Sequence, residues 1–129
     1  MTGHILVCDD EPHITLAVML KLSKAGFRVT TCNDGLAGWE AAQREHPDLL
    51  ISDLQMPHLD GLGLIRRLRE VAEFRELPVI LLTAKGMELE EEQLRTELGI
   101  KRLICKPFSP RDLLQTVQDL LGALAIVNA

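Results

Sequence analysis

Cysteine is scarce in this chain, and its placement excludes several classes of protein. The three cysteines, Cys8, Cys32 and Cys105, lie far apart and form no C-x-x-C pair. Disulfide scaffolds carry an even and dense set of cysteines, and zinc sites need close pairs, so neither class fits. Cys8 and Cys105 fall within apolar runs, where a free thiol packs as a small hydrophobe. We therefore expect reduced thiols, as in a cytoplasmic protein.

Long apolar stretches and an excess of basic residues are also missing. No window approaches the roughly 18 uninterrupted apolar residues of a membrane span, and no basic segment followed by an apolar stretch marks a signal peptide. The net charge of -5 argues against the basic surface on which nucleic-acid binding depends. We expect a cytoplasmic protein with neither a membrane nor a nucleic acid as a direct partner.

What the chain does contain is an alternation of short apolar runs with longer amphipathic stretches. Its 129 residues are 47% hydrophobic and 26% charged, as in a single globular domain. The apolar runs predict strands over 4–8, 28–32, 48–52, 78–83 and 101–105. Helical spacing predicts a first helix from Ile14 that closes at Gly26, helices over 35–45, 61–72 and 88–98, and a last helix from the Ser109 cap through Leu121. This order predicts a doubly wound (βα)5 α/β sandwich with a mostly parallel sheet.

The organisation along the chain is simple, with no internal repeat or linker. Three of the runs are almost continuously hydrophobic, as in parallel strands covered on both faces, while the more polar run 28–32 suits an edge. We expect one domain over 1–122 and a tail or linker start over 123–129. The apolar tail "LGALAIVNA" leaves three interpretations open: it docks on the domain, extends the last helix into a partner, or begins a linker.

Polar residues follow four of the predicted strands, at the points where ligands bind in open parallel sheets. Asp9 and Asp10 end the first strand, Asp53 the third, Thr83 the fourth and Lys106 the fifth. Clustered carboxylates attract a hard divalent cation such as Mg²⁺, and a lysine with a hydroxyl suits phosphoryl oxygens. Neither G-x-G-x-x-G nor G-x-x-x-x-G-K-[ST] is present, so phosphate is not expected in a nucleotide loop. The pattern favours a covalent aspartyl phosphate instead.

Four fragments in this order resemble the receiver domains of two-component response regulators: "ILVCDDEP", "LLISDLQMPHLDGL", "VILLTAKG" and "LICKPFSP". The resemblance runs from about residue 4 to about residue 121. It implies a flavodoxin-like sheet of strand order 2-1-3-4-5.

The resemblance also implies a metal site for Mg²⁺, with Mn²⁺ as the alternative. Asp10 and Asp53 would bind the ion directly, and Asp9 would reach it mainly through water. The main-chain carbonyl of Gln55 would supply a further oxygen. Gln55 and Lys85 occupy positions that influence autodephosphorylation in this family.

The remaining roles implied by the resemblance concern the phosphoryl group. Asp53 would be the phosphoacceptor, Thr83 would hydrogen-bond the phosphoryl group, and Lys106 would pair with another of its oxygens. The Lys106–Pro107 peptide bond would be cis. Such a domain catalyses only its own phosphorylation and dephosphorylation, so it is not an enzyme in the metabolic sense.

Partners follow from the same resemblance. The donor would be a sensor histidine kinase or a histidine phosphotransfer protein. Phosphorylation would shift an inactive–active equilibrium and control a downstream protein, or the chain's own output domain, through the fourth helix, fifth strand and fifth helix. A homodimer through the face that carries Leu103 is a further expectation. Leu103 departs from the family, which usually has an aromatic residue there.

Two other functions compete with this one. The first is a haloacid dehalogenase-like phosphatase, which uses a similar set of Asp, Thr, Lys and Mg²⁺. Such enzymes usually need an acid two residues after the nucleophile, but Gln55 follows Asp53 and Glu11 follows Asp9 in a loop that lacks the rest of the motif. The second is a receiver-like binding module that works without phosphorylation, which the complete set of acids, Thr and Lys disfavours.

Overall fold

A computed structural model describes residues 3–84 and 90–128, with side chains to Gly122. Its sheet has five parallel strands in the order β2-β1-β3-β4-β5. The strands are β1 (His4–Cys8), β2 (Arg28–Cys32), β3 (Leu49–Asp53), β4 (Val79–Thr83) and β5 (Arg102–Cys105). The predicted doubly wound sandwich and its strand order are confirmed, and the more polar β2 does lie at an edge.

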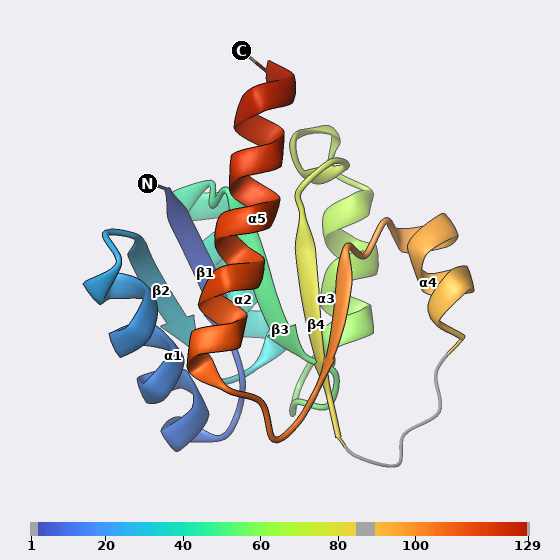
Figure 1. Cartoon of the computed structure of the whole chain (residues 1–129). Coiled ribbons are helices and arrows are strands. Elements are labelled where there is room, and N and C mark those ends of the chain that lie inside the picture. Colours follow the sequence, from blue (N-terminus) through green and yellow to red (C-terminus); the bar gives the residue numbers. More distant parts are fainter. Residues whose placement is uncertain (1–2, 85–89, 129) are drawn as a thin grey trace.

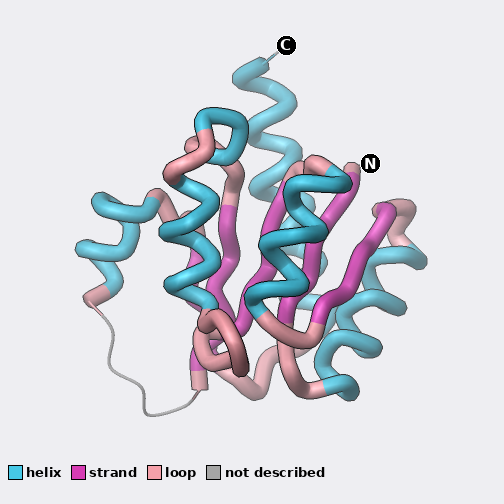
Figure 2. The backbone as a smooth tube through the Cα atoms, turned by 180° about the vertical axis from the view of Figure 1, so that it is seen from behind, coloured by secondary structure: helices cyan, strands magenta, loops and turns pink. Residues whose placement is uncertain are grey.

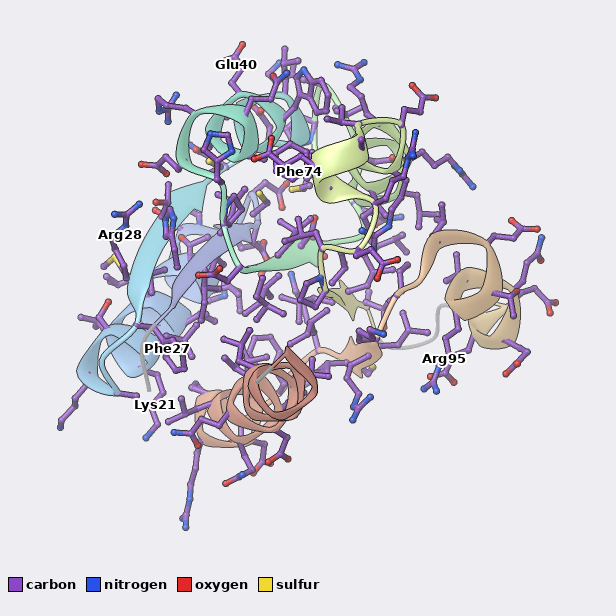
Figure 3. The ribbon with its side chains drawn as sticks, turned by 90° about the horizontal axis from the view of Figure 1, so that it is seen from above. Lys21, Phe27, Arg28, Glu40, Phe74 and Arg95 are labelled. Atoms are coloured by element: carbon purple, nitrogen blue, oxygen red, sulfur yellow. The ribbon has the colours of Figure 1, made fainter. Side chains whose placement is uncertain are left out.

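Helices cover both faces of this sheet. They are α1 (Pro12–Lys24), α2 (Gly35–Glu45), α3 (Gly61–Arg69), α4 (Glu91–Leu98) and α5 (Pro110–Asn128), with a 3₁₀ turn, η1 (Ala72–Phe74). α1 and α5 lie in front of the sheet in Figure 1, and α2 and α3 lie in front of it in the opposite view of Figure 2. Seen from above, the three layers separate clearly, and α4 stands beside β5 (Figure 3).

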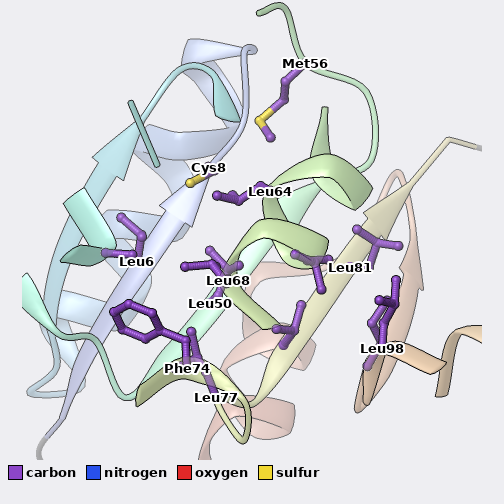
Figure 4. Packing of buried hydrophobic residues seen from close by; sticks show 14 of the residues in the cluster. Leu6, Cys8, Leu50, Met56, Leu64, Leu68, Phe74, Leu77, Leu81 and Leu98 are labelled. Atoms are coloured by element: carbon purple, nitrogen blue, oxygen red, sulfur yellow. The ribbon is translucent and has the colours of Figure 1, made fainter. Parts of the chain in front are cut away.

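Burial explains why the central strands are so apolar. Every residue of β1, β3 and β4 is buried, because these strands are covered on both faces. Side chains of a strand alternate between faces, so the core divides into two clusters. The cluster under α2 and α3, shown in Figure 4, includes Leu6, Leu50 and Leu81. The cluster under α1 and α5 includes Ile5, Ile51 and Leu82.

Side-chain caps set the starts of three helices next to the carboxyl ends of the strands. Asp34 accepts a hydrogen bond from the Ala37 N–H at 2.7 Å, and Asp60 accepts one from the Gly63 N–H at 2.7 Å. Ser109 accepts a longer one, 3.3 Å, from the Asp112 N–H, which confirms the predicted cap with Pro110 next to it.

Several helix boundaries differ from the prediction, and α1 begins at Pro12 instead of Ile14. α3 ends at Arg69 instead of residue 72, because the Arg69 guanidinium donates to the carbonyls of Leu98 and Phe74, at 2.8 and 2.7 Å. The chain then turns through η1 and buries Phe74. α4 begins at Glu91, while the predicted start at residue 88 lies outside the described residues. The first helix ends at Lys24, and Gly26 follows its cap with φ +104°.

The C-terminal part of the chain differs from the prediction at Cys105 and in the length of the last helix. Cys105 was expected to pack as a buried thiol, but it is exposed, because β5 is an edge strand. α5 continues as one helix to Asn128 and extends past the sheet (Figure 1). The helix thus extends over the tail, while a partner at its end and the domain boundary at 122 stay predictions. None of the described helices has the length and apolar character needed to span a bilayer.

Candidate functional site

At three strand ends, the residue that follows the strand still donates a backbone hydrogen bond to the neighbouring strand. The Asp9 N–H donates to the Cys32 carbonyl at 3.0 Å, and the Lys106 N–H donates to the Thr83 carbonyl at 2.7 Å. Leu54, which follows Asp53, donates to the Leu82 carbonyl at 2.9 Å. Because these bonds hold the backbone, Asp9, Asp53 and Lys106 project from rigid positions at one edge of the sheet.

Three carboxylates meet at this edge. Asp9, Asp10 and Asp53 each place an oxygen within 4.8 Å of the oxygens of the other two. Asp9 and Asp53 are 1% and 7% exposed, whereas Asp10 faces solvent. Buried like charges repel each other, so this arrangement needs a cation nearby. The structure thus brings together the three acids that the strand ends predicted.

Lys106 supplies a positive charge from within the chain. Its Nζ lies 2.8 Å from Asp9 Oδ2 and 3.4 Å from Asp53 Oδ1, with Glu11 Oε1 farther away at 3.7 Å. Burial by itself would lower the pKa of Lys106. The contact with Asp9 and the charges of Asp53 and Glu11 outweigh burial, so its pKa lies above the ordinary value. Lys106 is therefore a fixed ammonium at neutral pH.

Asp53 is the carboxyl whose ionisation is most disturbed. Burial and the negative charge of Asp9 raise its pKa to about 6, and Lys106 opposes this rise only in part. At neutral pH Asp53 is still mostly ionised, as a nucleophile must be. A cation near Asp53 would favour the ionised form further.

The cluster opens to solvent through a depression of about 180 Å³. Its lining is formed by Asp10, Glu11, Asp53, Leu54, Gln55, Ala84 and Lys106. Glu11, Leu54 and Ala84 were not predicted as site residues, although each directly follows a predicted site residue in the chain. Thr83 is buried at the end of β4 and does not line the depression, and Lys85 lies outside the described residues.

A close backbone contact holds the loop that follows Asp53. The Gly61 N–H donates to the Leu54 carbonyl at 2.9 Å. A Cβ at Gly61 would lie 2.2 Å from the Asp53 carbonyl oxygen, so only glycine fits here without a shift. The start of α3 therefore packs directly against the backbone of Asp53 and restricts the position of this residue.

The donor set fits Mg²⁺. Carboxylate and carbonyl oxygens are the ligands that this ion prefers, and the open depression leaves room for the waters that it usually keeps. Asp9 Oδ2 is buried, and the Lys106 ammonium, 2.8 Å away, is the one charged partner that it has within the described part of the chain. Such an oxygen gains from any additional cation or bound water.

Fold and site together define a class: a doubly wound α/β domain with an acidic, cation-binding pocket at the carboxyl edge of its sheet. Comparison with known families matches residues 5–118 to the response regulator receiver domain. The chain belongs to this family, which confirms the resemblance. Receiver domains are phosphorylated on an aspartate, bind Mg²⁺ in their acidic pocket and interact with histidine kinases. They are signalling proteins and not metabolic enzymes.

Curated relatives support the same family. The chain is 37% identical over 119 residues to response regulator Rre1 of Synechocystis, covering 92% of this chain and 51% of that protein. It is 36% identical over 121 residues to the alkaline phosphatase synthesis transcriptional regulatory protein PhoP of Bacillus subtilis, covering 94% and 49%. The chain thus spans about half the length of these relatives.

Solved structures agree with the sequence comparisons. Chemotaxis protein CheY4 of Vibrio cholerae superposes with a TM-score of 0.83 at 29% identity, over 92% of this chain and 98% of that one. The receiver domain of a sensor histidine kinase from Pseudomonas aeruginosa gives 0.82 at 29% identity, over 95% and 99%. That structure holds a magnesium ion coordinated in its active-site cleft.

Two further features touch on the resemblance. The Lys106–Pro107 peptide bond is cis, as the family implied. Leu103, at the position that is usually aromatic, is half-buried in β5 and packs with Leu94 against the cluster under α2 and α3. Its side chain therefore lies on the face of the sheet that α2 and α3 cover.

Proposed function

We propose that Asp53 is the residue that accepts the phosphoryl group, and that the donor is a phosphohistidine of a sensor histidine kinase or a histidine phosphotransfer protein. The observation that carries this proposal is the position of Asp53. It is a buried carboxyl within 4.8 Å of two other carboxylates and 3.4 Å from an ammonium, at the wall of an open depression.

In the proposed transfer, a carboxylate oxygen of Asp53 attacks phosphorus while the N–P bond of the phosphohistidine breaks. The electron pair of that bond returns to the imidazole, and an acyl phosphate forms on Asp53. Lys106 pairs with one phosphoryl oxygen, and the Thr83 hydroxyl donates to another. Hydrolysis then removes the phosphoryl group from Asp53. Water attacks phosphorus, the P–O bond to Asp53 breaks, and inorganic phosphate leaves the restored carboxylate.

Asp10, Asp53 and the main-chain carbonyl of Gln55 would hold Mg²⁺, or Mn²⁺ in its place, and Asp9 would reach it through water. Bound there, the ion supplies positive charge that offsets the charge of the incoming phosphoryl group. Lys106 remains near Asp9 and supplies the second positive charge of the site.

We also propose that the phosphorylated domain signals through the face formed by α4, β5 and α5. Its target is a downstream protein or an output domain of the same chain, and a homodimer through Leu103 is one form of this contact. Leu103 supports this face, because it is a half-buried side chain of the edge strand β5 and packs against the core cluster to which Leu98 of α4 belongs. We place this signalling in the cytoplasm.

No contact in the site favours the phosphatase. The position two residues after Asp53 holds Gln55, whose amide has no acidic proton for a leaving group. The full set of acids with Lys106 likewise gives no support to a module that works without phosphorylation.

The test is intact-protein mass spectrometry after incubation with Mg²⁺ and a small acyl phosphate. We expect one phosphoryl adduct, absent with a chelator and absent in Asp53→Asn. Asp119→Asn makes the same chemical change on the exposed face of α5 and should retain the adduct. An adduct that persists in Asp53→Asn refutes the assignment of the acceptor. Release of phosphate from an added monoester over many turnovers would support the phosphatase.

A further inference from the structure

Two of the three thiols face each other across neighbouring strands. Cys8 and Cys32 are direct partners in the parallel register of β1 and β2, one at the end of each strand. Residues paired in this way point to the same face of a sheet. Cys8 indeed belongs to the cluster under α2 and α3, and Cys32 packs against that cluster. This pair could not be predicted from the sequence, because 23 residues separate the two cysteines.

The spacing of the pair is compatible with a disulfide. Neighbouring strands lie about 4.8 Å apart, and the Cα atoms of disulfides are usually about 4.4–6.8 Å apart. Cys32 ends an edge strand that pairs only with β1 in the described sheet, and a bend follows at Asn33. Cys8 is fixed more firmly, since a Cβ at Gly38 would lie 2.6 Å from its sulfur. Figure 4 shows Cys8 beside Leu64.

The two thiols differ in access to solvent. Cys8 is fully buried, whereas Cys32 is partly exposed at the edge of the sheet. An oxidant in solution therefore reaches Cys32 first, and Cys8 is the nearest thiol that can react with the oxidised sulfur. This is the arrangement of an exposed and a resolving cysteine in redox-sensing proteins.

The pair also adjoins the acidic cluster. Asp9 follows Cys8 in the chain, and its N–H donates to the carbonyl of Cys32 at 3.0 Å. The Cα atoms of disulfides are most often about 5.5–6 Å apart, wider than the spacing of about 4.8 Å between neighbouring strands, so a cross-link would shift the two strand ends relative to each other. Asp9 and Asp10 would move with this backbone, and Mg²⁺ tolerates little departure from its octahedral geometry.

We propose that a hydroperoxide oxidises Cys32, that Cys8 and Cys32 then form a reversible disulfide, and that this cross-link weakens Mg²⁺ binding at the acidic cluster. Cys32 sulfur takes one peroxide oxygen and becomes a sulfenic acid, as the O–O bond breaks and an alcohol or water leaves. The Cys8 sulfur then attacks the Cys32 sulfur, the S–O bond breaks, and water leaves. The thiols lose two electrons in total, and the peroxide gains them.

The test uses a Cys105→Ser background, which removes the exposed thiol in β5. After treatment with hydrogen peroxide and then an alkylating agent, we expect a monomer about 2 Da lighter than the reduced, unalkylated protein, because the disulfide removes two hydrogens and leaves no thiol to alkylate. Digestion should yield one peptide that links Cys8 to Cys32, and dithiothreitol should restore both free thiols. In the added Cys8→Ala variant, Cys32 has no resolving thiol, so it should gain one or more oxygens, about 16 or 32 Da. The Cys32→Ser variant should show neither the cross-link nor the added oxygen.

Oxygen addition to Cys32 without a cross-link in the background protein overturns the disulfide. So does a cross-link between two molecules in place of one within the monomer. This part of the test needs no metal, and it therefore stands apart from the proposed function.

The effect on the metal rests on the proposed Mg²⁺ site and is measured by calorimetry on the reduced and oxidised monomers. We expect the oxidised form to bind Mg²⁺ about tenfold more weakly, as when the supporting contacts of a metal ligand are disturbed. Equal affinities of the two forms overturn this coupling. Absence of Mg²⁺ binding to the reduced protein refutes the metal site itself and with it the coupling, while the mass measurement still decides the disulfide.

Discussion

Replacing Asp53 with asparagine should stabilise the domain when no divalent cation is present. In the folded protein Asp53 is buried near the charge of Asp9, which raises its pKa to about 6, from an ordinary value of 3.8. Ionising this group at neutral pH therefore costs more in the folded protein than in the unfolded chain. Asparagine has a similar shape and no charge, so the variant avoids that cost.

The magnitude follows from the pKa. A rise from 3.8 to about 6 corresponds to about 3 kcal/mol at neutral pH, at about 1.4 kcal/mol per tenfold change. The variant also loses the 3.4 Å contact with Lys106 and must bury an amide, so we expect a net gain of about 1–2 kcal/mol. For 129 residues this raises the Tm by about 4–8 °C.

The assay is urea denaturation of both proteins between pH 4 and pH 8, with a chelator present. Near pH 4 the Asp53 carboxyl is largely protonated when folded, and its charge contributes little to the difference between variant and wild type. As the pH rises towards 6, the unfolded chain releases its proton first, so the wild type loses stability relative to the variant. Above pH 6 the difference should stay constant.

Asp119→Asn serves as the matched control, because the same change on an exposed helix face should alter the free energy of unfolding by less than about 0.5 kcal/mol. A variant at Asp53 that is less stable than the wild type at pH 7 would refute the reasoning. So would a stability difference of equal size at pH 4 and pH 7, since it could not arise from ionisation.

Three further outcomes follow from the same contacts. Mg²⁺ at a hundredfold excess over its Kd should stabilise the folded wild type by about 2.7 kcal/mol and so raise its Tm in a thermal-shift assay. An equal rise in the Tm of Asp53→Asn would argue against the site. Lys106→Met leaves buried Asp9 without its ammonium and should lower the unfolding free energy by about 3 kcal/mol in urea, unlike Lys101→Met at an exposed position. Gly61→Ala should cost about 1–3 kcal/mol and slow phosphorylation of Asp53, and wild-type behaviour would show that the loop adjusts freely.

Much of the fold could be predicted because the relevant signals are local. A run such as "LLIS" before Asp53 needs cover on both faces, and this requirement alone places β3 in the interior of the sheet. Parallel strands all end at the same edge, so the residues after them meet whatever the rest of the chain does. The acidic cluster is a direct consequence of that topology.

The features that could not be predicted depend on distant parts of the chain. The end of α3 is set by Arg69, whose guanidinium binds the carbonyl of Leu98 at the far end of α4. Cys105 follows the apolar pair Leu103 and Ile104, much as Cys8 follows Leu6 and Val7, and the position of β5 at the sheet edge exposes it. Such contacts leave no periodic signal, because they join segments whose relative placement is known only after folding.

The length of α5 turns it into a lever. Its 19 residues span about 28 Å, whereas the five-residue central strands span about 17 Å, so the helix outreaches the sheet. Leu113, Val117 and Leu120 anchor its first part in the core. From Val117, in the middle of this anchor, to Asn128 the helix is about 17 Å long, so a tilt of about 10° would move the far end by about 3 Å. A small rearrangement at the core would thus become a displacement of several ångströms at the end of the helix.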